Sequence, residues 1–142
     1  MNIGILEAGD FSTQALEMLS QLGPVHIFND GSINEFLSTQ NVLFIRLLHS
    51  VDESFLDQCK HLKIICTPTT GLNHIDLSEC ARRKITIISL KNEWQFLESI
   101  AATPEHTLGL ILSLLRNYKG CFLNLQNPSW TRDAYKGDEL SD

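Results

Sequence analysis

The chain has 142 residues, and its hydrophobic fraction of 43% and charged fraction of 20% are typical of a globular domain with a buried core. Its formal net charge of −6 argues against a nucleic-acid or anionic membrane surface as partner. The N-terminus MNIGILEAGD lacks the basic region of a signal peptide, and the longest apolar run, 108–115, is too short to span a bilayer. We therefore expect a cytoplasmic protein that binds neither nucleic acid nor membranes.

Short apolar runs alternate with helical segments over the first 90 residues. The runs are typical of buried strands and lie at 2–6, 25–28, 42–45, 63–66 and 85–88. The helical segments between them lie at 11–22, 33–39, 52–59 and 77–83, and Asp76 is the expected N-cap of the last one. This order predicts an α/β fold: a flavodoxin-like, doubly wound parallel sheet of five strands with helices on both faces. The loop Thr67–Leu77 begins at the carboxyl end of a strand, where such sheets bind ligands.

A long apolar helix follows the predicted sheet. The run Thr103-Pro-Glu-His is typical of a helix start, with Thr103 able to cap and Pro104 suited to the first turn. Leucine and isoleucine side chains between 108 and 115 cover almost the whole circumference, whereas a helix on one face of a sheet needs only one apolar stripe. The helix is either a central core helix of one domain or a connector between two lobes. The polar, aperiodic segment 118–142 favours the connector.

Two ordered motifs resemble those of the D-isomer-specific 2-hydroxyacid dehydrogenase family. The first is LKIICTPTTGLNHIDL at 62–77, and the second is AATPEHTLGLILSLLR at 101–116. Trp130 and the run Tyr135-Lys-Gly are similar to the family's linker before its nucleotide-binding domain. The resemblance implies a substrate-binding lobe at 1–100, an inter-lobe connector helix at 101–117, and a linker at 118–142 toward an NAD-binding domain that this sequence lacks.

The resemblance also implies a function. The intact enzyme would be an oxidoreductase that acts on the CH–OH group of a D-2-hydroxy acid and uses NAD or NADP to reduce the 2-keto acid. The family's G-x-G-x-x-G loop and its catalytic arginine, glutamate and histidine follow the matched motifs, so we expect no catalytic residue in this chain. We expect the fragment alone to be inactive and to bind no cofactor, and we expect homo-oligomers through the exposed connector helix.

Six residues are site candidates through the same resemblance. The matching loop of the family offers backbone N–H groups to the substrate carboxylate, which implies that role for Thr70 and Gly71. Arg46 and Leu47 match a segment that borders the substrate, although Arg46 could equally point outward from a strand end. Ala102 and Thr103 match a position near the cofactor, but Thr103 fits better as an N-cap.

Several residues depart from the family pattern. Thr69 replaces the first glycine of the loop and Asn73 replaces an aspartate, while Leu47 and His49 replace residues with hydroxyl groups. These changes leave the identity of the 2-hydroxy acid open.

Two other histidines, His74 and His106, could act as acids or bases because histidine titrates near neutral pH. Neither matches the family's catalytic position, so we expect both to be structural. The four cysteines, Cys59, Cys66, Cys80 and Cys121, show no metal-ligand spacing, so we expect free thiols and no metal site.

The sequence is also compatible with two alternative functions. The chain could be a non-catalytic module that binds a small acid or acts like a corepressor. It could also be an unrelated flavodoxin-like protein. A receiver domain would need an aspartate where Arg46 ends the third strand, and a flavodoxin would need a better phosphate loop than Ala8–Thr13.

Overall fold

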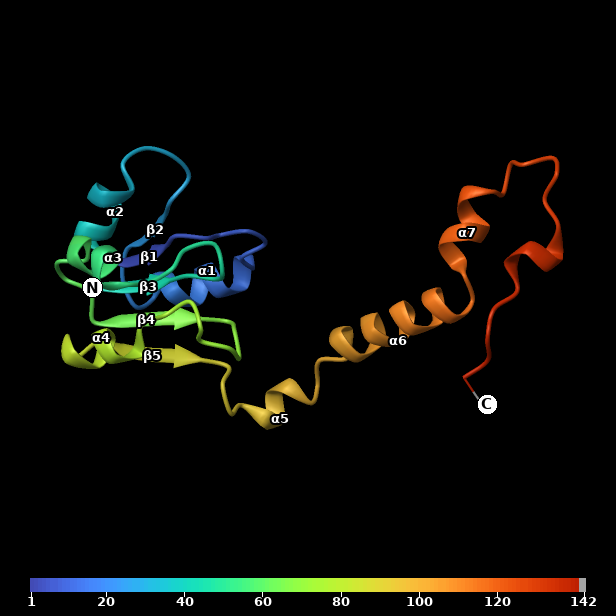
Figure 1. Cartoon of the computed structure of the whole chain (residues 1–142). Coiled ribbons are helices and arrows are strands. Elements are labelled where there is room, and N and C mark those ends of the chain that lie inside the picture. Colours follow the sequence, from blue (N-terminus) through green and yellow to red (C-terminus); the bar gives the residue numbers. More distant parts are fainter. Residues whose placement is uncertain (141–142) are drawn as a thin grey trace. The chain divides into compact units, whose positions relative to one another are not determined.

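The computed structural model describes residues 1–140 and is shown in Figure 1. The chain divides into two units, Met1–Glu93 and Trp94–Asp142.

The first unit is built on one five-stranded sheet. All its strand pairs are parallel and the strand order is β2-β1-β3-β4-β5. The strands are β1 (Ile3–Ile5), β2 (Val25–Ile27), β3 (Val42–Phe44), β4 (Ile64–Thr67) and β5 (Thr86–Ser89). Each lies within one residue of an apolar run in the sequence, and the order is the flavodoxin-like one. The predicted fold class is therefore confirmed.

Each of the four helices of this unit begins at a side-chain cap. The helices are α1 (Thr13–Ser20), α2 (Ile33–Thr39), α3 (Glu53–Gln58) and α4 (Leu77–Arg82). Their caps are Ser12, Ser32, Asp52 and Asp76. The Asp76 carboxylate accepts a hydrogen bond of 2.9 Å from the N–H of Glu79, which confirms the predicted cap. Such caps satisfy backbone donors that the first helical turn leaves unpaired, so they fix where each helix starts after a loop.

The larger part of the core lies on one face of the sheet. Leu43 and Ile65 are fully buried there, and they belong to one cluster with Leu37 of α2, Leu56 of α3 and Cys80 of α4. Burial of each such side chain contributes about 1.5–3 kcal/mol. Three helices therefore cover this face.

The opposite face is covered unevenly. Ile5, Phe44, Cys66 and Ile88 align across β1, β3, β4 and β5. Ile5 is fully buried and the Phe44 ring packs edge-on against Phe11 just before α1, at a centroid distance of 5.5 Å. Ile88, however, is 53% exposed. One helix about 10 Å wide covers roughly two strands spaced about 4.8 Å apart, so α1 leaves the β5 side open.

The second unit contains α5 (Trp94–Leu97), α6 (Ala102–Leu115), α7 (Tyr118–Leu123) and a 3₁₀ turn, Arg132–Tyr135. The long helix predicted from the sequence is α6. The prediction that Thr103 caps it is wrong: the cap position is held by Ala101, which makes no side-chain hydrogen bond, and Thr103 is the second helical residue. Pro104 is the third. A proline is tolerated throughout the first turn because N–H groups there have no intrahelical acceptor, so it does not fix the start.

No residue of α6 is buried, and several of its leucines are more than half exposed. No helix within residues 1–140 is long and apolar enough to cross a membrane.

Candidate site at the carboxyl edge of the sheet

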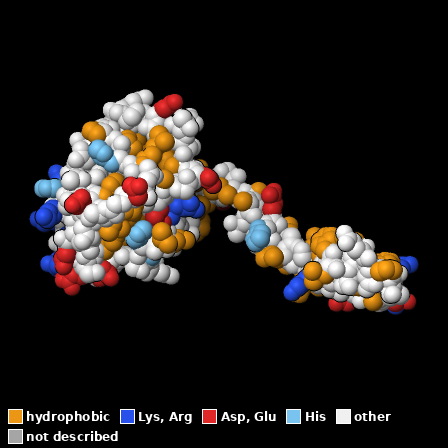
Figure 2. All heavy atoms as spheres, turned by 90° about the horizontal axis from the view of Figure 1, so that it is seen from above, with side chains coloured by type: hydrophobic (Ala, Val, Ile, Leu, Met, Phe, Trp, Pro, Cys, Tyr) orange, Lys and Arg blue, Asp and Glu red, His pale blue; other side chains and the backbone are white. Residues whose placement is uncertain are grey.

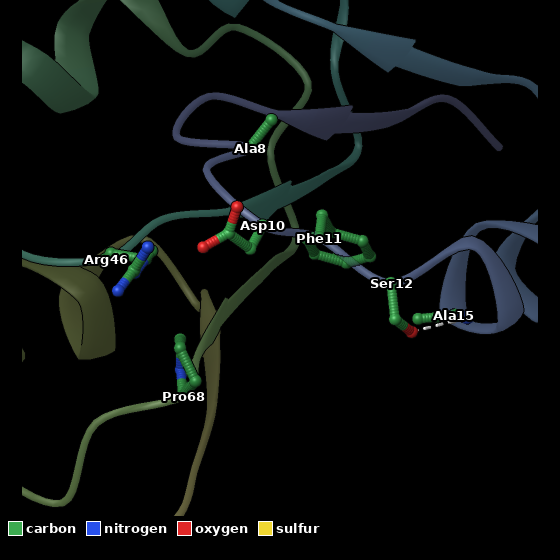
Figure 3. A pocket seen from close by; sticks show the side chains of 7 residues that line it. All are labelled: Ala8, Asp10, Phe11, Ser12, Ala15, Arg46 and Pro68. Atoms are coloured by element: carbon green, nitrogen blue, oxygen red, sulfur yellow. Dashed lines mark hydrogen bonds between the residues drawn. The ribbon is translucent and has the colours of Figure 1, made fainter.

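Loops that follow β1, β3 and β4 surround two neighbouring hollows at the carboxyl edge of the sheet. The first hollow is lined by Leu6, Glu7, Gly9, Arg46, Leu47, Leu48, Pro68 and Thr69. The second is lined by Ala8, Asp10, Phe11, Ser12, Ala15, Arg46 and Pro68 (Figure 3). Arg46 and Pro68 line both. This is the edge at which open α/β sheets bind ligands.

Arg46 carries the only positive side chain among the residues that line these two hollows. Figure 3 shows its guanidinium on the same hollow as the side chains of Asp10 and Pro68. The guanidinium forms no hydrogen bond or ion pair within residues 1–140, and the residue is exposed. Its fork of N–H donors is therefore available to a carboxylate or phosphate.

The loop after β4 is closed by threonine hydroxyls. The hydroxyls of Thr67 and Thr69 lie 3.0 Å apart, and the Thr69 hydroxyl also donates a hydrogen bond of 2.8 Å to the carbonyl of Gly71. Thr69, which stands where the family pattern has glycine, thus holds the loop through its own side chain. The backbone N–H groups of Thr69, Thr70 and Gly71 form no hydrogen bond with any atom of the described chain. They are three consecutive free donors.

Gly71 has an ordinary backbone conformation and open space beside it. Its φ lies outside the left-handed region, and a Cβ built there would meet no heavy atom within 4 Å. The fold therefore does not require glycine at this position. What glycine provides is an unobstructed approach to the backbone N–H groups.

Glu7 is the residue that the sequence reasoning missed. Its carboxylate accepts hydrogen bonds from the backbone N–H groups of Arg46, Leu48 and His49, at 2.9, 3.1 and 3.2 Å, and lies 2.9 Å from His49 Nδ1. The side chain is only 8% exposed. These contacts join positions about 40 residues apart, so no local pattern could indicate them. An acidic residue directly after a buried strand was the only available signal.

Opposing effects set the protonation of Glu7. Burial raises the pKa of its carboxyl, while the hydrogen bonds from the His49 side chain and from the backbone of Leu48, His49 and Arg46 lower it, and the net pKa is below the ordinary value of 4.5. Glu7 is therefore ionised at neutral pH. It serves as a hydrogen-bond acceptor and not as a proton donor.

The structure places the other predicted site residues as follows. Leu47 lines the first hollow and is 69% exposed. Thr70 is exposed and adjoins Thr69, although it does not itself line a hollow. Ala102 and Thr103 are exposed in the first turn of α6, which belongs to the unit that begins at Trp94, and their part in cofactor binding stays a prediction.

The histidines offer little acid–base chemistry to these hollows. Nδ1 of His49 is held by Glu7. His74 has a buried Nε2 with no hydrogen-bond partner among the described atoms, and its carbonyl accepts a hydrogen bond of 2.7 Å from the N–H of Val51. His106 is an exposed residue of α6. No group of His, Cys, Asp and Glu within residues 1–140 could hold a metal ion. The groups at this edge that could bind an anion are the Arg46 guanidinium and the free N–H groups at 69–71.

Comparison with known proteins gives a family match over most of the first unit. The model of the D-isomer specific 2-hydroxyacid dehydrogenase catalytic domain matches residues 6–93. D-3-phosphoglycerate dehydrogenase of Bacillus subtilis is 26% identical over 138 residues, which cover 96% of this chain and 25% of that protein. Hydroxypyruvate reductase of Thermotoga maritima is 25% identical over 127 residues, covering 89% of this chain and 38% of that protein.

Solved structures share the fold. D-lactate dehydrogenase from Aquifex aeolicus, determined with NAD and lactic acid, superposes with a TM-score of 0.80 at 20% identity and covers 99% of this chain and 41% of that one. This chain spans about a quarter of the length of the Bacillus relative. The five-stranded sheet, the two motifs and the match over residues 6–93 together show that the chain belongs to the D-isomer specific 2-hydroxyacid dehydrogenase family.

Proposed function

We propose that this chain is the substrate-binding lobe of an oxidoreductase that interconverts a D-2-hydroxy acid and its 2-keto acid with NAD or NADP. One observation supports this most: the free guanidinium of Arg46 and the free N–H groups of Thr69, Thr70 and Gly71 lie at the ligand-binding edge of a sheet from this family. Both are donors suited to the carboxylate that every 2-hydroxy acid carries.

In this proposal the chain binds and orients the acid. The N–H groups at 69–71 hold the carboxylate, Arg46 neutralises its charge, and Leu47 borders the rest of the substrate. Fixing one end of the acid in this way limits the orientations of its C2 atom, which is how a binding lobe contributes to rate. The nicotinamide cofactor, when bound, supplies the hydride.

We infer that the described residues alone do not complete a site for that cofactor. A pyrophosphate group needs an open glycine loop at a helix start. Here the guanidinium of Arg46 lies against the loop between β1 and α1, since a Cβ on Gly9 would lie 2.6 Å from Nη1 of Arg46. Ala102 and Thr103 offer one hydroxyl group. The proposal therefore assigns cofactor binding and the catalytic groups to a nucleotide-binding lobe, and we expect these 142 residues alone to be inactive.

Binding and activity measurements on this chain test the proposal. Calorimetry should give no binding of NAD, and NADH with pyruvate should show no turnover. Pyruvate itself should bind with a Kd in the millimolar range, since one anion held by a few hydrogen bonds gives about −4 kcal/mol. Arg46→Ala should abolish that binding. The control Lys63→Ala, which removes an exposed positive charge at the opposite edge of the sheet, should not. Micromolar NAD affinity would contradict the assignment.

We also propose that a second copy of the chain covers α6. Leu110 and Leu114 are 58% and 82% exposed, and an apolar surface of this kind marks a site of association. Figure 2 shows hydrophobic side chains at the surface of the part of the chain to which α6 belongs. A cytoplasmic location is proposed on the grounds that all four cysteines are free thiols.

A further inference from the structure

We infer that Glu7 is a positioning residue for substrate binding: its carboxylate shapes the loop 46–49 so that Arg46 faces the acid. This inference rests on the proposed function, and it assigns a role to a residue that does not itself touch the substrate.

The Glu7 carboxylate lies at the centre of the turn formed by residues 46–49. Three of its four hydrogen-bond donors are backbone N–H groups, from Arg46, Leu48 and His49, and the fourth is His49 Nδ1. A backbone whose N–H groups converge on one anion has few alternative conformations. The direction in which the Arg46 side chain leaves that backbone is fixed with it.

Packing contributes little to the middle of this loop. Leu47 and Leu48, the two residues after Arg46, are 69% and 81% exposed, so they contribute little buried apolar area. The nearest buried residues on either side are Ile45 and Val51. Val51 pairs with the loop after β4. Between these two residues the His49 ring lies near that of Phe55, at a centroid distance of 6.3 Å, and the Glu7 carboxylate accepts three backbone hydrogen bonds.

Neutralisation of the Glu7 charge has opposite effects on acid binding in the two cases, a positioning role and a purely electrostatic one. A negative charge near Arg46 disfavours the approach of another carboxylate. If Glu7 acted only through its charge, its neutralisation would strengthen the binding of a 2-keto acid. If it acts by shaping the loop, neutralisation weakens binding, because a glutamine amide nitrogen cannot accept the N–H bonds that the second carboxylate oxygen accepts.

The experiment compares Glu7→Gln with Asp10→Asn in the full 142-residue chain, with pyruvate as the probe and amide NMR shifts as the readout. Asp10 lines the second hollow with Arg46, so its variant removes the same charge without touching the loop's hydrogen bonds (Figure 3). We expect a Kd about tenfold higher for Glu7→Gln and an unchanged or lower Kd for Asp10→Asn. A Glu7→Gln variant that binds pyruvate as tightly as the unmodified chain, or more tightly, overturns the inference.

A second variant covers the case in which Glu7→Gln does not fold. His49→Phe keeps an aromatic ring beside Phe55 but removes one of the four contacts of Glu7, and it should raise the Kd severalfold. Exchange of the amide protons at 46, 48 and 49 should accelerate in either folded variant, while that of Ile65 in the core stays slow. Unchanged affinity and exchange in His49→Phe would overturn the inference.

The dependence on pH supplies a readout that a neutral side chain cannot give. Because the folded pKa of Glu7 is depressed below 4.5, the stabilisation it provides is present above pH 4.5 and is lost as the pH falls through the folded pKa. The difference in Tm between the unmodified chain and Glu7→Gln should therefore shrink on acidification below pH 4.5. A difference that is constant from pH 7 to pH 3 would contradict a role for the ionised carboxylate.

If the unmodified chain does not bind pyruvate at all, the proposed function itself fails. That outcome differs from a failure confined to Glu7, in which the unmodified chain binds pyruvate and the Glu7 variant binds it equally well.

Discussion

Replacement of Gly71 by alanine tests separately whether stability and whether acid binding depend on glycine at this position. The added Cβ would meet no heavy atom within 4 Å, and the backbone at this position is outside the left-handed region. Alanine at such a site stabilises a protein by about 0.4–1 kcal/mol because it restricts the unfolded chain. For a unit of this size we therefore expect Tm to stay constant or to rise by up to about 6 °C.

Acid binding should respond in the opposite direction. In the proposed site a carboxylate approaches the free N–H groups at 69–71, and a methyl group at Gly71 stands in the open space beside them. Loss of one hydrogen bond to a charged group amounts to about 1.5–3 kcal/mol, which corresponds to a Kd at least about tenfold higher. The variant should thus be as stable as the unmodified chain or more so, and should bind pyruvate more weakly.

The assay is a thermal melt and a pyruvate titration on the same samples. Gly31→Ala is the matched control: a Cβ there also meets nothing within 4 Å, but the φ of +92° strains any side chain. This control should lose stability by about 1–2 kcal/mol and keep its pyruvate affinity. A Gly71→Ala variant that binds pyruvate with unchanged affinity would refute the claim that the carboxylate approaches this part of the backbone.

Three further predictions follow from the same structure. Arg46→Lys keeps the charge but loses the planar fork of donors, so the pyruvate Kd measured by calorimetry should rise severalfold, and an equal Kd would show that Arg46 acts only as a point charge. Sedimentation should show a dimer or larger oligomer that the double substitution of Leu110 and Leu114 by glutamate converts to a monomer; a monomeric unmodified chain at high concentration would contradict association through α6. Burial raises the pKa of Cys59 to about 12 and that of Cys66 to about 11. At pH 8 both thiols should therefore react with a disulfide reagent far more slowly in the folded than in the unfolded chain. Equal rates would contradict their burial.

Apolar runs and capping residues were sufficient to predict the sheet and its helices. Each strand lies within one residue of an apolar run of four or five residues, and Asp76 was recognisable as a cap from its position before Leu77. Local chemistry of this kind is readable because its physical cause lies within a few residues of its effect. The start of α6 was misplaced because a proline is allowed at several positions of a first turn. The short helix α7, Tyr118–Leu123, has too few residues for a periodic pattern and was not predicted.

The site was only partly predictable for a different reason. The backbone donors of Thr70 and Gly71 were predicted from a motif, and so was the position of Arg46 at a strand end, whereas the free N–H of Thr69 was not. The role of Thr69 in closing the loop depends on a hydroxyl whose acceptor only the folded loop reveals. The contacts of Glu7 depend on the parallel pairing of β1 with β3, which brings a residue after the first strand to the loop after the third. Such long-range contacts are properties of the topology, and no single stretch of sequence encodes them.

The central claim is that the carboxyl edge of this sheet binds the carboxylate of a 2-keto acid. A residue-resolved NMR titration of the ¹⁵N-labelled chain with pyruvate tests it most directly. We predict saturable shifts, largest for the amides of Thr69, Thr70 and Gly71 and for the side chain of Arg46. A second basic hollow, which includes Lys63 and Lys84 and lies at the amino ends of the strands, is the competing location for an anion. Shifts confined to that hollow, or no saturable shifts at all, would contradict the account.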